Sequence, residues 1–127
     1  MKLAIFKYSK LDDRYINSSG NDTMNGSLTI TGSLTTAGRK KAVAIKTTDY
    51  TITDIDEVIV CNKATAMTIT LPIATGSGQS YYINNVGAGT ITVSKSGDTI
   101  NGETSQEVGQ WETIELIDYG NNQWSII

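Results

Sequence analysis

The acidic side chains of this sequence are its best candidates for catalytic chemistry. Asp54, Asp56 and Glu57 lie close together in the sequence, and Glu112 and Glu115 lie further along the chain. A glycosidase places two carboxylates on either side of a cleft and keeps their pKa values apart. The run Asp54-Ile55-Asp56 has a simpler explanation as a turn between two strands, because aspartate hydrogen-bonds to nearby backbone in turns. We therefore predict no catalytic residues and no enzymatic activity.

Metal binding is restricted by the composition. The sequence has no histidine and a single cysteine, Cys61, so a bound cation would need oxygen ligands, as Ca²⁺ does. Asp54, Asp56 and Asp118 could supply them, but their spacing does not match an EF-hand loop. Cys61 follows an apolar run at residues 58–60, which favours a buried, unreactive thiol. We predict no metal site and no cofactor.

Charge and hydropathy argue against two classes of partner. The formal net charge is −3, the sequence pI is about 4.8, and the short basic run at residues 39–41 is too sparse to follow a phosphate backbone. No apolar segment reaches the ~18 residues of a membrane span, and residues 1–14 lack a signal-peptide core. We therefore predict neither nucleic-acid binding nor membrane insertion.

Aromatic residues are the remaining candidates for a binding site. Aromatic faces stack on the apolar faces of sugar rings, and loops that are held by a rigid sheet are frequent binding sites. Five aromatic residues are therefore candidates for contact with a ligand or glycan: Tyr81, Tyr82, Trp111, Tyr119 and Trp124. The alternative for both tryptophans is burial in the core or in a subunit interface.

Short strands must position these residues. From Ala42 onward, apolar residues alternate over short segments that are separated by turn residues, a pattern typical of a β-sandwich or barrel. Asn101-Gly102 predicts a tight hairpin, because both residues tolerate positive φ, and residues 120–123 predict another. We predict an all-β fold in which residues 42–127 form a small antiparallel β-sandwich head, similar to a jelly roll. Strands are expected at residues 50–53, 57–61, 67–71, 81–84, 90–94, 111–119 and 124–127.

A short repeat precedes this head. Residues 25–36 contain two aligned hexads, NGSLTI and TGSLTT. Because side chains alternate along an extended chain, Leu28, Ile30 and Leu34 share one face. A single chain cannot bury this row of side chains, and such repeats are stable when they are stacked or oligomerised. We predict that residues 21–41 form an extended β stalk of identical chains and a hinge; the alternative is a mobile linker.

The N-terminal segment has the pattern of an attachment strand. Residues 1–10 alternate loosely, with Leu3 and Ile5 on one face and Phe6 and Tyr8 on the other. Such a segment can add to the sheet of another protein, which supplies backbone hydrogen bonds and pockets for apolar side chains. We predict that residues 1–20 attach the protein through these four side chains. The alternatives are a frayed terminus and a strand that packs within the oligomer.

Two parts of the chain resemble known proteins. The run LDDRYIN at residues 11–17, followed by residues 21–38, resembles the shaft repeats of tailed-bacteriophage fibre proteins, which recur as DDRYVN…GDTMTGDLTI…G. Residues 46–127 resemble a small β domain of phage structural proteins. Four segments carry this second resemblance: TTDYTIT at 47–53, TITLP at 68–72, YINNVGAG at 82–89 and DTINGE at 98–103.

The resemblance implies a homotrimer, because the shafts of that family are homotrimeric and rich in β-structure. It also implies a non-enzymatic protein of the virion surface, made in the cytoplasm of the host bacterium. The expected protein is a short head fibre or capsid decoration protein, which residues 1–20 attach to a phage capsid protein and which projects a trimeric β head. The alternative is a small tail or baseplate fibre that binds a host receptor or glycan.

Overall fold

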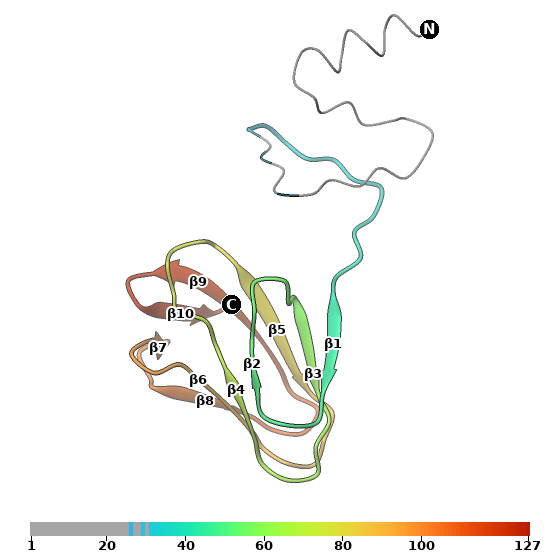
Figure 1. Ribbon diagram of the computed structural model, residues 1–127, viewed down its shortest axis with the longest axis vertical. Coiled ribbons are helices and arrows are strands. Elements are labelled where there is room, and N and C mark those ends of the chain that lie inside the picture. The colour runs from blue at the N-terminus through green and yellow to red at the C-terminus, as the bar shows by residue number, and fades with distance from the viewer. Residues whose placement is uncertain (1–25, 27–28, 30) are drawn as a thin grey trace, which may run out of the picture. The chain divides into compact units, whose positions relative to one another are not determined.

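The computed structural model describes Gly26, Thr29 and residues 31–127 (Figure 1). The chain divides into two units, Met1–Ala37 and Gly38–Ile127. The described residues of the first unit are exposed and belong to no strand, and Leu34 has 66% of its surface exposed. The other predicted stalk residues and all the predicted anchoring residues lie outside the described part of the chain: Leu28 and Ile30, and Leu3, Ile5, Phe6 and Tyr8.

The Gly38–Ile127 unit is all β, as predicted. Residues 31–127 contain no helix, and so no helix that is long and apolar enough to cross a membrane. The strands are β1 (Val43–Lys46), β2 (Tyr50–Thr51), β3 (Val58–Cys61), β4 (Met67–Thr70), β5 (Ser80–Asn85), β6 (Ile91–Ser94), β7 (Thr99–Ile100), β8 (Ser105–Val108), β9 (Thr113–Gly120) and β10 (Gln123–Ile126).

The strands form two sheets, each of which contains both parallel and antiparallel pairs. The larger sheet has the order β1-β3-β5-β9-β10-β7, and the smaller sheet has the order β2-β4-β6-β8. β1, β3 and β5 are parallel, and so are β2, β4 and β6. β9 runs antiparallel to β5, and β8 runs antiparallel to β6. The prediction of an antiparallel sandwich is therefore wrong, and the jelly-roll arrangement is not confirmed.

The parallel pairs arise because the chain crosses to the other sheet after each strand from β1 to β6. A short hairpin turn cannot join parallel strands, so each strand from β1 to β4 pairs in parallel with the next but one along the chain. The path from β3 to β6 repeats at an interval of 24 residues in both sheets, since Val58 pairs with Tyr82 and Met67 pairs with Ile91. This part of the fold is therefore a coil that winds between two sheets.

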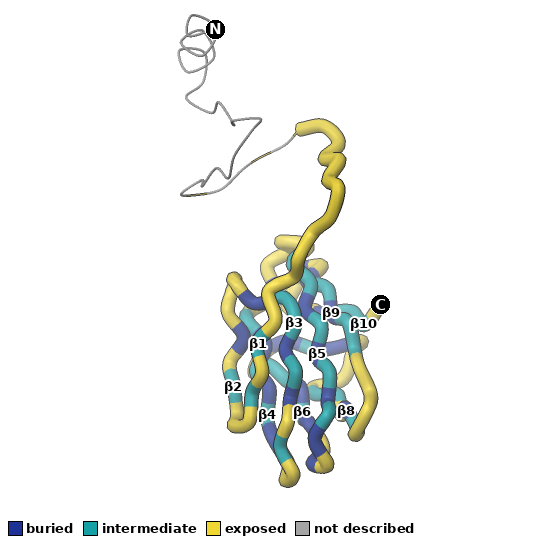
Figure 2. The backbone as a smooth tube through the Cα atoms, turned by 90° about the vertical axis from the view of Figure 1, so that its right-hand side faces the viewer, coloured by how far each residue is buried: buried dark blue, intermediate teal, exposed yellow. Residues whose placement is uncertain are grey.

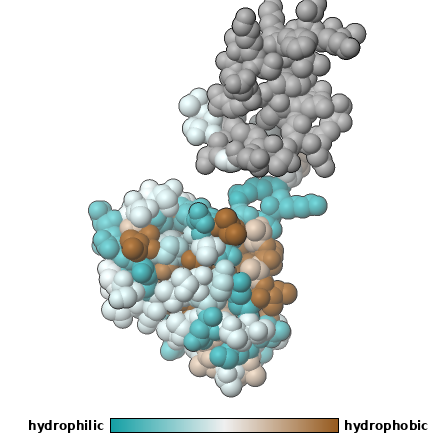
Figure 3. All heavy atoms as spheres, in the orientation of Figure 1, coloured by the Kyte–Doolittle hydropathy of each residue, from teal (hydrophilic) through white to brown (hydrophobic). Residues whose placement is uncertain are grey.

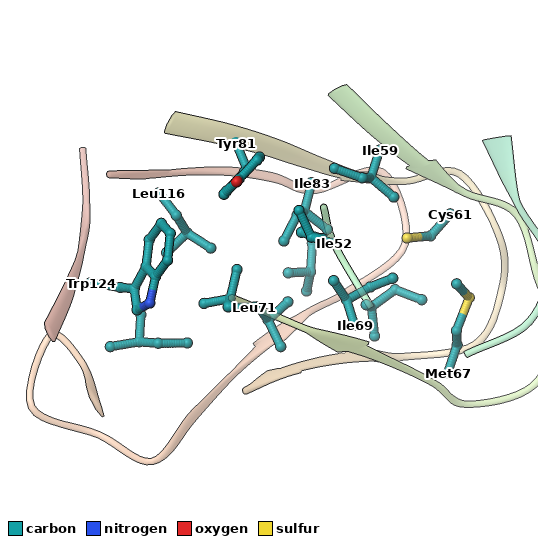
Figure 4. Close-up of a cluster of buried hydrophobic side chains, with 14 of the residues drawn as sticks. Ile52, Ile59, Cys61, Met67, Ile69, Leu71, Tyr81, Ile83, Leu116 and Trp124 are labelled. Atoms are coloured by element: carbon teal, nitrogen blue, oxygen red, sulfur yellow. The ribbon is translucent and has the colours of Figure 1, made fainter. Parts of the chain in front are cut away.

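The core lies between the sheets (Figure 4). Along β5, buried residues alternate with half-buried ones (Figure 2), as expected for a strand with one face on the core. Fully burying a large apolar side chain contributes about 1.5–3 kcal/mol. The core residues are Ile52, Ile59, Cys61, Met67, Ile69, Leu71, Ala74, Tyr81, Ile83, Ile91, Val93, Ile100, Val108, Leu116 and Trp124.

At one end of the sheets, which we call the glycine end, lie the connections at residues 62–66, 86–90 and 109–112. The second connection packs directly on the first: the Gly87 N–H donates to Cys61 O (3.2 Å) and the Gly89 N–H donates to Lys63 O (3.0 Å). A Cβ atom would lie 2.3 Å from Lys63 O at Gly87 and 2.0 Å from Thr65 O at Gly89. Only glycine fits at these two positions, because backbone occupies the space of a side chain.

The buried side chain of Asn85 joins the glycine end to the sheets. Its Nδ2 donates to Gly89 O (2.8 Å) and to Val108 O (2.9 Å), and its Oδ1 accepts from the Gly87 N–H (3.0 Å). Buried polar groups are tolerated when they are hydrogen-bonded in this way. Asn85 thus occupies a position on the core face of β5 without leaving a polar group unsatisfied.

Both predicted turns are confirmed, but only the second joins two paired strands, because β7 and β8 belong to different sheets. Asn101 and Gly102 have φ values of 50° and 87°, and the residues that flank them, Ile100 and Glu103, form an antiparallel bridge. The turn between β9 and β10 has two asparagines at positive φ. Asparagine and glycine adopt this conformation more readily than other residues, which is why the local sequence located these turns.

Candidate functional site

The other end of the sheets, which we call the carboxylate end, contains the connections at residues 52–57, 71–79, 95–98 and 121–122. Three buried aspartates organise it: Asp56, Asp98 and Asp118. Each of them accepts hydrogen bonds from residues in one or more of these connections. Carboxylate side chains therefore hold the connections at this end, whereas backbone packing holds them at the glycine end.

Asp118 holds the β4–β5 connection. It lies on β9, is 2% exposed, and accepts hydrogen bonds from the N–H groups of Thr75 (3.0 Å), Gly76 (2.8 Å) and Ser77 (3.1 Å). The hydroxyls of Thr75 (3.2 Å) and Ser77 (2.7 Å) and the N–H of Gly120 (3.0 Å) also donate to it. One side chain thus replaces the strand partner that this loop lacks.

These hydrogen bonds determine the protonation state of Asp118. Burial alone would raise the pKa of Asp118, because a low-dielectric environment disfavours the charged form. The hydrogen bonds from Gly76, Ser77 and Thr75 outweigh burial and hold the pKa well below its usual range. Asp118 is therefore ionised at neutral pH, and it cannot supply the proton that a general acid must give.

Asp56 closes the β2–β3 connection. Its Oδ2 accepts hydrogen bonds from the Thr53 N–H (2.8 Å), the Thr53 hydroxyl (2.8 Å) and the Tyr50 hydroxyl (2.9 Å). Burial favours a higher pKa for Asp56, but these hydrogen bonds and the charge of Lys46 lower it. The interpretation of Asp54-Ile55-Asp56 as a turn is confirmed.

Asp98 links three connections of the carboxylate end, those at residues 71–79, 95–98 and 121–122. It accepts hydrogen bonds from the Ala74 N–H (2.8 Å) and from Asn122 Nδ2 (2.9 Å). Within the described part of the chain, no three cysteine, aspartate or glutamate side chains are grouped as metal ligands would be.

The other carboxylates that could have taken part in catalysis lie apart. Glu57 forms an ion pair with Arg39, and Glu112 accepts a hydrogen bond from the Gly109 N–H (2.8 Å). Glu115 lies on β9, paired with Tyr82. None of these three glutamates lines the cavity described next.

A cavity of about 260 Å³ opens at the carboxylate end. The β4–β5 connection provides much of its wall, and Asp54 reaches it from the β2–β3 connection. Strands β5, β9 and β10 each contribute one residue, namely Tyr81, Asp118 and Trp124. The cavity therefore brings together two of the predicted aromatic residues and two of the aspartates that were considered as metal ligands from the sequence.

Tyr81 and Trp124 belong both to the core and to the wall of this cavity. Their ring centroids are 5.7 Å apart, with the rings tilted by 39°, and the two residues are 2% and 1% exposed. Burial raises the pKa of Tyr81, and the charges of Asp54, Asp56 and Asp118 raise it further. Trp124 Nε1 is buried without a hydrogen-bond partner among the described residues.

The other three aromatic residues lie on separate surfaces. Tyr82 lies on β5 with the Lys41 ammonium 3.5 Å from its ring centroid, a cation–π contact. Trp111 lies in the β8–β9 connection, is 73% exposed and has a φ of 68°. Tyr119 is 53% exposed on β9 and hydrogen-bonds to Gln123. The five aromatic residues do not form one platform.

The free edge of the larger sheet is a second notable surface. Val43 and Ile45 of β1 are 62% and 69% exposed, and Figure 3 shows apolar surface on the side where β1 lies. The hydrogen bonds to β3 use the carbonyls of Ala42 and Lys46. Because ladder bonds alternate along a strand, the backbone groups of Val43 and Ile45 face away from β3. An edge of this kind can pair with another chain.

Sequence reasoning missed both the cavity and the edge. The walls of the cavity come from five separate segments, so no local sequence motif predicts the cavity. Identical residues at an interval of 24 could have predicted the coil: Ile59 with Ile83, Ala64 with Ala88, and Thr68 with Thr92. The alternation of apolar residues in VAIK at Val43–Lys46 could have predicted the edge strand.

No protein-family model matches the chain, and no curated protein matches it.

Proposed function

We propose that the chain is a non-enzymatic surface protein of a tailed-bacteriophage virion, a short head fibre or capsid decoration protein. Three copies associate, residues 1–20 attach to a capsid protein, and the Gly38–Ile127 unit forms the head. The resemblance of residues 11–38 and 46–127 to phage fibre and structural proteins supports the class. The exposed apolar edge of β1 is the structural observation that supports association of the chains.

The edge of β1 is poorly protected against pairing. Edge strands are commonly guarded by lysines that keep other chains away. Here Lys41 lies over the ring of Tyr82 and Lys46 lies over the ring of Tyr50, each at 3.5 Å from the ring centroid. Because both ammonium groups lie over aromatic rings, neither lysine protects the edge of β1 against pairing with another chain. An identical chain that covers the edge would remove apolar surface from water, at about 25 cal/mol for each Å².

The hexad repeat also requires that several chains associate. Leu34 is 66% exposed, although the repeat places it on the same face as two other apolar residues. A row of this kind is buried only when several copies of the chain come together. The carboxylates support the non-enzymatic part of the proposal, because Asp56, Asp98 and Asp118 are committed to holding loops.

The mass of the full-length protein in light scattering tests the association. We expect about three chains, each of 13.7 kDa. Ile45→Lys should give a folded monomer, because it places a charge on the edge without disturbing the core. Ile55→Lys is the matched control, since Ile55 is 80% exposed in the β2–β3 connection, and it should keep the wild-type mass. A monomeric wild type would contradict the proposed trimer.

Attachment is tested by sedimentation with particles of the phage that encodes the chain. The full-length protein should sediment with the capsids, and deletion of residues 1–20 should abolish this while the mass stays at about three chains. Equal sedimentation of both forms would exclude residues 1–20 as the attachment segment.

A small tail or baseplate fibre is the second candidate, and the cavity at the carboxylate end favours it. A tail fibre must recognise the host, and a cavity with polar and aromatic walls is a feature of binding sites. The purified protein would then bind host cells and block adsorption of the phage, which a decoration protein would not do.

A further inference from the structure

We infer that the cavity at the carboxylate end binds a neutral sugar ring and recognises its hydroxyl groups. This inference does not depend on the proposed trimer, because residues of one chain form the cavity described above. It assigns a ligand class to the head, whether the head lies on a capsid or on a tail.

The charges in the cavity wall disfavour an anion. Asp54 and Asp118 line the cavity, and no lysine or arginine is among the lining residues. A phosphate or carboxylate ligand would therefore meet two negative groups without a compensating charge. Asp118 is occupied by the hydrogen bonds of the β4–β5 connection. Asp54, which is exposed, offers a carboxylate at the rim that can accept hydrogen bonds from a ligand.

Trp124 provides an independent observation. It lines the cavity, is 1% exposed, and its Nε1 has no hydrogen-bond partner among the described residues. A buried donor without an acceptor is unfavourable, so a ligand whose acceptor reaches this N–H would be stabilised. A quaternary ammonium ion such as tetramethylammonium brings positive charge but no acceptor, and an anion is disfavoured by the aspartates. A hydroxyl group both accepts and donates.

The remaining wall fits a ligand with many hydroxyls. The Tyr81 hydroxyl and the Gln79 amide can each donate and accept hydrogen bonds, while Pro72 and Ile73 offer apolar surface to the C–H groups of a sugar ring. Ligand sites with a few placed polar groups on a mainly apolar wall are common. A volume of about 260 Å³ corresponds to a single ring rather than to a length of polysaccharide.

The two tryptophans allow a direct test in the full-length protein. Each gives an indole N–H signal in a ¹⁵N NMR spectrum, and Trp111→Phe assigns the two signals. Titration with glucose, galactose and N-acetylglucosamine should shift the Trp124 signal saturably for at least one sugar, in the millimolar range that is usual for weak ligands. The signal of the exposed Trp111 should not move. Asp54→Ala should weaken binding about tenfold or more, and Glu107→Ala, an exposed carboxylate on β8, should not.

Other results would overturn the inference. A saturable shift of Trp124 with tetramethylammonium but with none of the sugars would assign the cavity to a cation, and one with inorganic phosphate alone would assign it to an anion. A shift of Trp111 alone would place sugar binding at the glycine end. No saturable shift with any sugar would show that the cavity is not a sugar site. Ile45→Lys should leave the sugar response unchanged, so failure of the trimer and failure of the sugar site are distinguishable.

Discussion

The two ends of the Gly38–Ile127 unit are closed by different chemistry. At the glycine end, the connections lie backbone against backbone, and Gly87 and Gly89 have no space for a side chain. At the carboxylate end, Asp56, Asp98 and Asp118 hold the connections through hydrogen bonds from backbone and hydroxyl groups. The first arrangement leaves no room beside the chain, whereas the second leaves a cavity of about 260 Å³.

The difference indicates how well each end tolerates amino-acid substitutions. Backbone packing tolerates almost no substitution at the contact, because neither partner can move without breaking the ladder. A loop that is held by one carboxylate can vary in its other side chains while its backbone stays in place. The carboxylate end is therefore the end at which a binding site can develop, in agreement with the general finding that binding residues lie on loops above a rigid sheet.

The largest expected effect is at the glycine end. Gly89→Ala should lower the free energy of unfolding by about 3 kcal/mol, because the new Cβ atom would lie 2.0 Å from Thr65 O. Urea unfolding measures this change. Gly38→Ala is the control, since a Cβ atom at Gly38 would meet nothing within 4 Å. Equal stability of the two variants would show that the connections separate easily.

Cys61 reports on the same end. Burial raises the pKa of its thiol to about 11, and its carbonyl accepts the N–H groups of Val86 and Gly87. Alkylation of the native protein should therefore be slow at mildly alkaline pH, since the thiolate is the reactive form. Gly89→Ala should accelerate it. Rapid alkylation of the wild type would contradict tight closure of this end.

An intermediate effect is expected at the carboxylate end. Asp118→Asn should lower the free energy of unfolding by about 1–3 kcal/mol, because an amide replaces an acceptor that takes bonds from Thr75, Gly76 and Ser77. Chemical unfolding of both proteins at neutral pH measures the loss. A neutral result would mean that the loop does not need the charge. Glu107→Gln, on the exposed side of β8, is the matched control.

The pH dependence gives Asp118 a separate signature. Its pKa is lower in the folded state than the value of about 3.9 expected in the unfolded chain. The stabilisation is therefore complete above the unfolded pKa and is lost as the pH falls below about 4 toward the folded pKa. Stability of the wild type should fall steeply with acid in this range, and that of Asp118→Asn should fall less. The pKa of Asp56 is also lowered, so some acid dependence should persist in the variant.

The smallest effect is expected for a single hydroxyl group in the same loop. Ser77→Ala removes one hydroxyl donor of Asp118 and the acceptor of the exposed Gln79 N–H (3.1 Å), and it keeps the N–H donors of Thr75, Gly76 and Ser77 itself. We expect a loss of about 1 kcal/mol, which thermal unfolding would detect. A loss as large as that of Asp118→Asn would show that the hydroxyl, and not the backbone, holds the loop.

Much of the local structure followed from the sequence. The alternation around Met67 and Ile69 and around Ile91 and Val93 located β4 and β6 with the correct face inward, because side-chain direction is a local property of a strand. Asn101-Gly102 located a turn for the same reason. These predictions needed no knowledge of which strands are neighbours.

The pairing of strands could not be predicted in this way. It depends on whether a connection returns to the same sheet or crosses to the other one, and residues 62–66 and 86–90 carry no turn motif that distinguishes these paths. The same limit applies to the cavity: Asp54, Asp118 and Trp124 meet only after the sheets have formed. Asp118 was considered as a metal ligand from its chemistry alone, whereas its hydrogen-bond donors in the β4–β5 connection lie about forty positions earlier in the chain.

The 24-residue coil has a consequence for the history of this protein. Duplication of one coil would add a strand to each sheet and keep the register and the direction of every side chain. Coils of other lengths can also join the ladders, since Val43 pairs with Val58 and Tyr50 pairs with Ile69, at intervals of 15 and 19 residues, but each coil adds a whole strand to a sheet. Heads of different sizes could therefore descend from one ancestral gene by gain or loss of whole coils, so that size would vary among descendants in discrete steps.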